Sequence, residues 1–173
     1  MWLLLGAALA QTEAQPEWAL DRVVDGAHWT LAAGELRRDG AVITDKVRGL
    51  PVFAAGRVVF TRLAIEPIGT ELIVLADGKQ RVLAGPETRP DRIALSPDGR
   101  HVAYVSGRTG WASVYVQALS DEQPVQLTNT AVHRRKGQPP LGFTAPPREG
   151  LEFRGDSLCW HNPEPVCISW RRR

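Results

Sequence analysis

Residues 91–129 constrain the fold of this chain more than any other stretch, because short alternating apolar runs and turn residues follow one another in a fixed order. Two such runs, 91–95 and 101–105, flank the sequence Ser96-Pro97-Asp98-Gly99. In a turn of this kind proline presets φ, aspartate bonds back to its own backbone, and glycine adopts the positive φ that other residues resist. We therefore assign these four residues a structural role, as the turn between two antiparallel strands.

The same stretch contains two further strand candidates. Residues 113–117 alternate after a glycine-containing loop, and residues 124–127 follow a short polar segment. Four short strands within about 40 residues make up the repeating unit, or blade, of a β-propeller. A weaker copy of the pattern at 50–84 precedes the clear one by about 43 residues, a spacing in the range of propeller repeats.

Four short motifs recur in this stretch in the order expected of a known repeat. The Ser-Pro-Asp-Gly-Arg turn at 96–100 is followed by Tyr-Val-Ser at 104–106, Val-Tyr-Val at 114–116 and Gln-Leu-Thr-Asn at 126–129. Together they resemble the TolB-type, WD-like β-propeller repeat, which is also similar to blades in the propeller domains of prolyl-oligopeptidase-type peptidases. The resemblance implies a fold more directly than an activity, because one fold hosts many functions.

We predict an all-β fold, a propeller-like stack of short four-stranded antiparallel sheets with about three to four blades. Residues 16–173 form a single domain in this interpretation. It consists of a degenerate blade at 16–48, blades at 49–88 and 89–129, a connector rich in proline, glycine and charge at 130–150, and a partial blade at 151–173. Both a small closed ring and an open partial propeller are compatible with this count.

The degenerate blade has the weakest strand pattern. Its strands are expected at 18–24, 28–35 and 41–47, with Arg37-Arg38-Asp39-Gly40 as a turn. This would make it a three-stranded version of the regular blade.

The first ten residues form an apolar run that is followed by polar residues to about position 15. The small residues that end this run fit a signal peptide cleaved after Ala10. The run is too short to span a bilayer as a helix, which needs about 20 residues. We expect an exported protein, periplasmic or secreted; the alternative is an apolar N-terminal strand or helix.

The two cysteines, Cys159 and Cys167, are consistent with export. Their segment has the pattern of a hairpin that turns at 162–164, which places the two cysteines opposite each other and predicts a disulfide. Such a bond forms in an oxidising compartment. The neighbouring His161 would bring the number of possible metal ligands to only three, so we predict no metal site.

Catalytic motifs are weak or missing. Gly155-Asp156-Ser157-Leu158 matches the name-giving motif of the GDSL hydrolases, but that family places its serine near the start of an α/β fold. Nucleotide-binding and zinc-protease motifs are not present in the sequence. The 21 lysines and arginines are nearly balanced by 19 acidic residues, which gives no reason to expect a nucleic-acid partner. We therefore predict no catalytic residue and no cofactor.

The function favoured by these patterns is a non-catalytic, exported propeller module that serves as a protein-interaction scaffold, with self-association as an option. Trp and Arg are enriched at binding hot spots. The candidate partner-binding residues are Arg108 and Trp111 in a rim loop and Arg134, Arg135 and Phe143 in the connector. For Trp111, packing against the adjacent blade is the structural alternative. The alternative function is a propeller fragment or relic of a prolyl-oligopeptidase-type peptidase that lacks its hydrolase domain.

Overall fold

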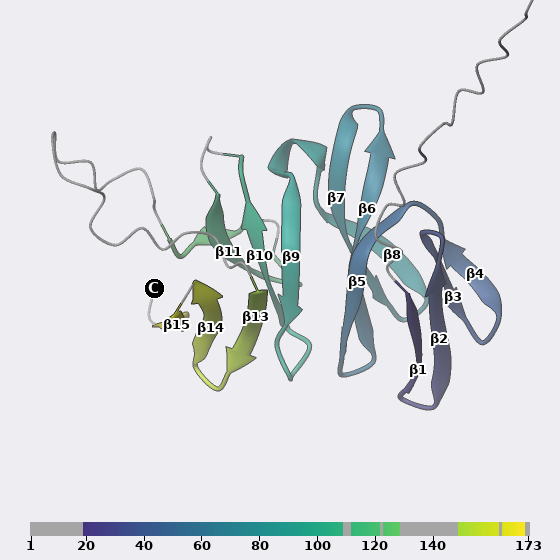
Figure 1. The fold of residues 1–173 in the computed structure, drawn as a ribbon, viewed down its shortest axis with the longest axis horizontal. Coiled ribbons are helices and arrows are strands. Elements are labelled where there is room, and N and C mark those ends of the chain that lie inside the picture. The colour runs from purple at the N-terminus through teal and green to yellow at the C-terminus, as the bar shows by residue number, and fades with distance from the viewer. Residues whose placement is uncertain (1–18, 109–111, 122, 129–148, 163, 172–173) are drawn as a thin grey trace, which may run out of the picture.

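The computed structural model describes residues 19–108, 112–121, 123–128, 149–162 and 164–171. Within these residues the chain forms four antiparallel sheets that follow one another along the sequence and stand side by side (Figure 1). The expected signal segment and all but the end of the expected connector lie outside the described residues. The prediction of an all-β, propeller-like stack of antiparallel sheets is confirmed.

We number the sheets 1 to 4 in chain order, and in each one the strands are neighbours in the order of the sequence. Sheet 1 contains β1 (Leu20–Val24), β2 (Ala27–Ala32), β3 (Glu35–Arg38) and β4 (Ala41–Thr44). Sheet 2 contains β5 (Val47–Ala54), β6 (Arg57–Ile65), β7 (Ile68–Ala76) and β8 (Lys79–Ala84).

Sheets 3 and 4 continue the same up-and-down order. After a short 3-10 helix η1 (Pro86–Thr88), sheet 3 contains β9 (Pro90–Leu95), β10 (His101–Ser106), β11 (Ser113–Ala118) and β12 (Val125–Gln126). Sheet 4 contains β13 (Glu149–Arg154), β14 (Ser157–Asn162) and β15 (Glu164–Ser169).

The strand expected over 28–35 in sheet 1 is in fact two strands. A two-residue turn at Ala33-Gly34 separates β2 from β3, and both residues have positive φ. Turns of this kind match the right-handed twist of the flanking strands. An alanine in that conformation is uncommon, so the sequence alone did not indicate a turn here.

The middle strands of sheets 2 and 3 are buried on both faces, because each sheet is packed between two neighbours. Residues 102–106 of β10 and 113–117 of β11 are all buried. This explains why the sequence shows nearly continuous runs of Val, Ala and Tyr there. β-Branched and aromatic side chains suit such pleated, packed surfaces.

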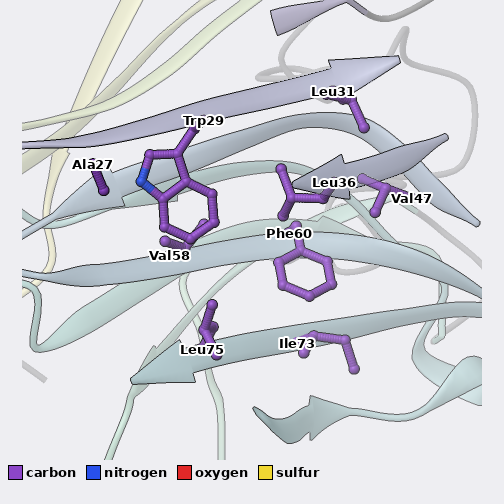
Figure 2. Packing of buried hydrophobic residues seen from close by; sticks show 9 residues of the cluster. All are labelled: Ala27, Trp29, Leu31, Leu36, Val47, Val58, Phe60, Ile73 and Leu75. Carbon is purple, nitrogen blue, oxygen red and sulfur yellow. The ribbon is translucent and has the colours of Figure 1, made fainter. Parts of the chain in front are cut away.

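Three hydrophobic clusters hold the sheets together. The first joins sheets 1 and 2 and includes Trp29, Leu36, Phe60 and Ile73 (Figure 2). The second joins sheets 2 and 3, and the third joins sheets 3 and 4 around Trp160. Among the described residues no cluster joins sheet 1 to sheet 4, and the two sheets stand at opposite ends of the row in Figure 1. The described part of the chain is thus an open arc of blades.

Charged side chains lie on the outer faces of the two end sheets, although Val23 and Val42 are also exposed on sheet 1. On sheet 1, His28 Nε2 lies 2.6 Å from Asp21 Oδ1, and Arg37 pairs with Glu35. On sheet 4, Arg154 pairs with Glu152 on the face that points away from sheet 3. A polar outer face is what terminal repeats of a stacked array need in order to stay soluble.

The predicted disulfide between Cys159 and Cys167 is present. The two cysteines are directly opposite each other in the pairing of β14 with β15. A cross-link at this position ties the edge strand of sheet 4 to its neighbour. It also reduces the number of conformations open to this hairpin in the unfolded chain.

Candidate functional site

The β6–β7 hairpin reaches farther than its neighbours at one of the two ends of the stack where the strands turn. Both of its strands have nine residues, whereas the middle strands of sheet 3 have six. Figure 1 shows the hairpin rising above the rest of this end. The turn between Ile65 and Ile68 contains a cis Glu66–Pro67 peptide bond, the arrangement of a type VI turn.

The tip of this hairpin is apolar and exposed. Ile68 is 84% exposed and Ile65 is 57% exposed, the first being the most exposed large hydrophobic side chain among the described residues. Neither isoleucine contributes to the hydrophobic clusters between the sheets. Large apolar side chains held in solvent by a rigid hairpin are a typical means of contact with another protein.

Arg108 lies beside this tip, in the loop that follows β10. Its backbone N–H donates to Ser106 Oγ at 3.2 Å, and its guanidinium carbon lies 4.6 Å from the centre of the Tyr115 ring. The hydroxyl of Ser106 in turn donates to the carbonyl of Thr88 in η1. These contacts position an arginine on the rim with its charge available, because a cation over an aromatic ring keeps the full charge.

The hairpin tip, η1 and the loop after β10 together enclose a shallow recess of about 450 Å³. We call this surface the rim site; its lining includes Pro67, Ile68, Glu87, Arg89 and Arg108. Apolar and charged groups therefore alternate around one opening. Such a mixture is common at protein contact surfaces, and the described residues of the site form no arrangement of acid, base and nucleophile for catalysis.

Only one of the partner-binding residues predicted from the sequence lies among the described residues. Arg108 is at the rim site, whereas Trp111, Arg134, Arg135 and Phe143 lie outside the described residues. Ile65 and Ile68 were not recognised from the sequence. Their immediate neighbours, Ala64 and Glu66 beside Ile65 and Pro67 and Gly69 beside Ile68, do not distinguish an exposed position from a buried one. Only the unequal strand lengths reveal that they project beyond the sheet.

The polar side chains of the turn at 96–99 form hydrogen bonds within the turn itself. Asp98 Oδ1 accepts hydrogen bonds from the hydroxyl of Ser96 at 2.6 Å and from the backbone N–H of Arg100 at 3.0 Å. These bonds, that from Ser96 first, lower the pKa of Asp98. A carboxylate held in this way stabilises the turn and is a poor general base.

Other ionisable groups also have structural explanations. Burial raises the pKa of Tyr104 to about 12, so its hydroxyl stays protonated between sheets 2 and 3. Within the described ranges no group of three or more His, Cys, Asp or Glu side chains is placed to hold a metal ion. In the same ranges no helix is long and apolar enough to cross a membrane.

Comparison with known proteins supports the fold. No family model matches the chain, and no curated protein matches it. Among solved structures, TolB from Acinetobacter baumannii is similar over 84% of this chain and 36% of its own, with a TM-score of 0.53 and 13% identity. A TolB protein from Agrobacterium tumefaciens is similar over 65% of this chain and 42% of its own, with a TM-score of 0.47 and 17% identity.

This chain thus spans less than half the length of either TolB structure. At 13% identity the likeness to the Acinetobacter protein concerns the fold and leaves activity open. Together with the four meandering sheets, it shows that the chain has a TolB-like β-propeller architecture.

Proposed function

We propose that this chain is a non-catalytic, exported β-propeller module that binds another protein through the rim site. The observation that carries the proposal is the exposed apolar tip of the β6–β7 hairpin, with Ile68 84% exposed next to the positively charged Arg108. Exposing an isoleucine of this kind offers no gain to the isolated fold, whereas burying it against a partner stabilises the complex by roughly 1.5–3 kcal/mol.

The chemistry of the rim site indicates what the partner presents. Ile65, Pro67 and Ile68 require an apolar side chain to pack on. Arg89 and Arg108 outnumber Glu87 in the lining and therefore favour a carboxylate next to it. Self-association would need another surface of this chain that offers an apolar side chain next to a carboxylate. The outer face of sheet 4 carries the Arg154–Glu152 ion pair, which makes it less suitable than a dedicated partner for the apolar tip, whereas sheet 1 exposes Val23 and Val42 and is the face that self-association would use.

Export is supported by the cross-link between Cys159 and Cys167, since disulfides persist in oxidising compartments. The proposal expects the mature protein to begin near Gln11 and to lack free thiols. Intact mass under non-reducing conditions checks both points. An uncleaved chain with two free thiols would remove the support for a periplasmic or secreted location.

The contact proposal is tested with a photo-crosslinking residue placed at Ile68 in the exported protein. We expect one discrete protein adduct from this position, and its loss when Arg108→Glu is added. The matched control places the same residue at Val42, which is 52% exposed on sheet 1, away from the rim site. Equal adducts from both positions, or none from Ile68, would contradict the proposal.

Catalysis is tested separately with peptide and ester substrates. The scaffold proposal expects no turnover by the purified protein. Turnover that a serine-directed inhibitor abolishes would favour the peptidase-derived alternative, for which the described residues offer no specific support.

A further inference from the structure

A cleft of about 590 Å³ opens between sheets 2 and 3. It lies at the ends of their strands that are opposite the rim site. Sheet 2 lines it with Arg57, Lys79 and Arg81, and sheet 3 lines it with Arg100. Among the described residues that line the cleft there is no aspartate or glutamate. The cleft thus collects four permanent positive charges between two packed sheets.

The alternation of the strands explains why these four side chains face one another. In a strand, residues two positions apart point to the same face. Arg57 precedes Val59 by two positions, Arg81 precedes Leu83, and Arg100 precedes Val102, and these three apolar residues are buried between sheets 2 and 3. Arg57 and Arg81 therefore occupy core-facing positions of β6 and β8 just beyond the hydrophobic cluster, and Lys79, two positions before Arg81, shares its face. Arg100 lies in the turn immediately before β10, next to the same end of the cluster.

The backbone fixes two of the arginines. Arg57 Nη1 donates to the carbonyl of Gly99 at 2.5 Å, and Arg81 donates to the carbonyl of Leu119. Both bonds cross from sheet 2 to sheet 3. Each guanidinium has further N–H donors, because arginine carries five in a planar fork.

Among the described residues the cations of the cleft lack ion-pair partners, although Arg100 interacts electrostatically with Asp98. By contrast, Arg37, Arg62 and Arg154 each pair with a glutamate. Asp77, two residues before Lys79, is exposed in the turn between β7 and β8, and two other nearby acids serve their own turns. Asp98 binds Ser96 and the N–H of Arg100, and Asp121 accepts from the N–H of Gln123 at 3.1 Å.

The equivalent ends of the other two interfaces are closed by aromatic side chains. Trp29 and Phe53 meet edge to face at 5.3 Å between sheets 1 and 2. Trp170 lies 4.5 Å from His101 and 5.3 Å from Phe153 between sheets 3 and 4. Only the middle interface of the described arc replaces this closure with clustered cations around an opening.

We propose that this cleft binds a small anion that carries three or four negative charges on phosphate or carboxylate oxygens. Its volume is within the range of about 300–1,000 Å³ that is usual for small-molecule sites. Charge-assisted bonds from arginine are the strong ones, and an apolar floor of Val74, Ala76 and Ala118 intensifies them by excluding water. A cleft lined by one sign of charge also concentrates ions of the opposite sign.

Calorimetric titration with tripolyphosphate and, separately, with citrate tests the proposal. The variant is Lys79→Gln with Arg100→Gln, which removes two charges whose side chains make no hydrogen bond or ion pair described above. The control is Arg37→Gln with Arg154→Gln, which lowers the net charge equally on the outer faces of sheets 1 and 4. Thermal melts establish that each variant is folded.

We expect at least one probe to bind the wild-type protein at low ionic strength. Its affinity should fall about tenfold or more in the cleft variant, because two charge-assisted contacts to the anion are lost, and should change by less than about twofold in the control. The stronger of the two probes identifies the class of oxygen that the cleft prefers.

Failure of both probes to bind would overturn the proposal. So would an equal loss of affinity in the two variants, since it would show an effect of net charge alone. Should the double variant not fold, Lys79→Gln alone is compared with Arg37→Gln on the same criteria. Ile68→Asp should leave the titration unchanged, so a failure of the rim proposal and a failure of the cleft proposal can be told apart.

Discussion

The interface between sheets 1 and 2 and the interface between sheets 2 and 3 join the same kind of blade, yet they end differently. The first stays apolar to the turn end, with Ala27, Val58 and Leu75 buried beside Trp29 (Figure 2). The second ends at Val59 and Leu83 and continues as charged side chains. The architecture therefore does not require apolar residues at the last core-facing positions, and one interface can contribute stability while another is free for binding.

The cost of this difference falls on the middle interface. Like charges around a partly enclosed space repel one another. The protein compensates with hydrogen bonds that cross the interface. Gln117 Nε2 donates to the carbonyl of Leu83 at 3.3 Å, in addition to the bonds from Arg57 and Arg81 described above.

The largest effect on stability is expected at the interface of sheets 1 and 2, which ends in apolar side chains. Trp29 is 4% exposed, and Trp29→Ala should lower the free energy of unfolding by about 3–5 kcal/mol through lost burial and a cavity next to Phe53. Urea denaturation measures this. Val23→Ala, at a side chain that is 68% exposed on the same sheet, should change it by less than about 0.5 kcal/mol. A loss below about 1 kcal/mol for Trp29→Ala would show that the aromatic closure is not what holds sheets 1 and 2 together.

A smaller effect, an increase in stability, is expected at the interface of sheets 2 and 3, which ends in cationic side chains. Arg100→Leu makes the middle interface more like the first one and removes one repelling charge, so stability should rise by about 0.5 kcal/mol at low salt. The gain should shrink as salt screens the remaining charges. Urea midpoints at low and high sodium chloride check this. Arg154→Leu, which breaks an ion pair with Glu152, should give no such gain; a similar gain in both variants would contradict the repulsion argument.

The smallest effect concerns the closure between sheets 3 and 4. Burial lowers the pKa of His101 below 6.5, opposed by Asp98 and assisted by Arg171 and Arg100. The folded state therefore favours the neutral imidazole. Its contribution to stability is complete above pH 6.5, declines as the pH falls below that value, and levels off below the pKa of the folded protein.

Denaturation midpoints at about pH 7.5 and about pH 5.5 measure this decline. His101→Gln should flatten it. Asp98→Asn should retain it, because the lowered pKa of Asp98 affects stability in a more acidic window, below its ordinary value of 3.8. If His101→Gln kept the wild-type decline, other groups would be responsible for it.

Local chemistry explains which features could be predicted from the sequence. The turn at 96–99 is encoded by residues that shape their own backbone, as the bonds around Asp98 show. The disulfide followed from counting positions on either side of one short hairpin. The Ala33-Gly34 turn failed the same kind of reasoning because only one of its two residues is a usual turn former.

The two proposed sites were out of reach of such reasoning. Ile68 becomes a projecting side chain only because β6 and β7 extend beyond the neighbouring sheets. Arg57 and Arg81 lie on two strands of sheet 2, and Arg100 lies in the turn before β10 of sheet 3. Alternation indicates that each shares a face with an apolar residue, but it does not say which neighbouring sheet that face meets.

The sequence by itself determined the blades, their order and the chemistry of their turns, because strand alternation and turn formation depend on residues close together in the chain. Only the tertiary structure decided that the described sheets form an open arc and that four cations share one cleft. The physical reason is that these features depend on which faces pack against each other. Contacts between blades join residues some 40 positions apart, as Arg57 and Gly99 show with a separation of 42.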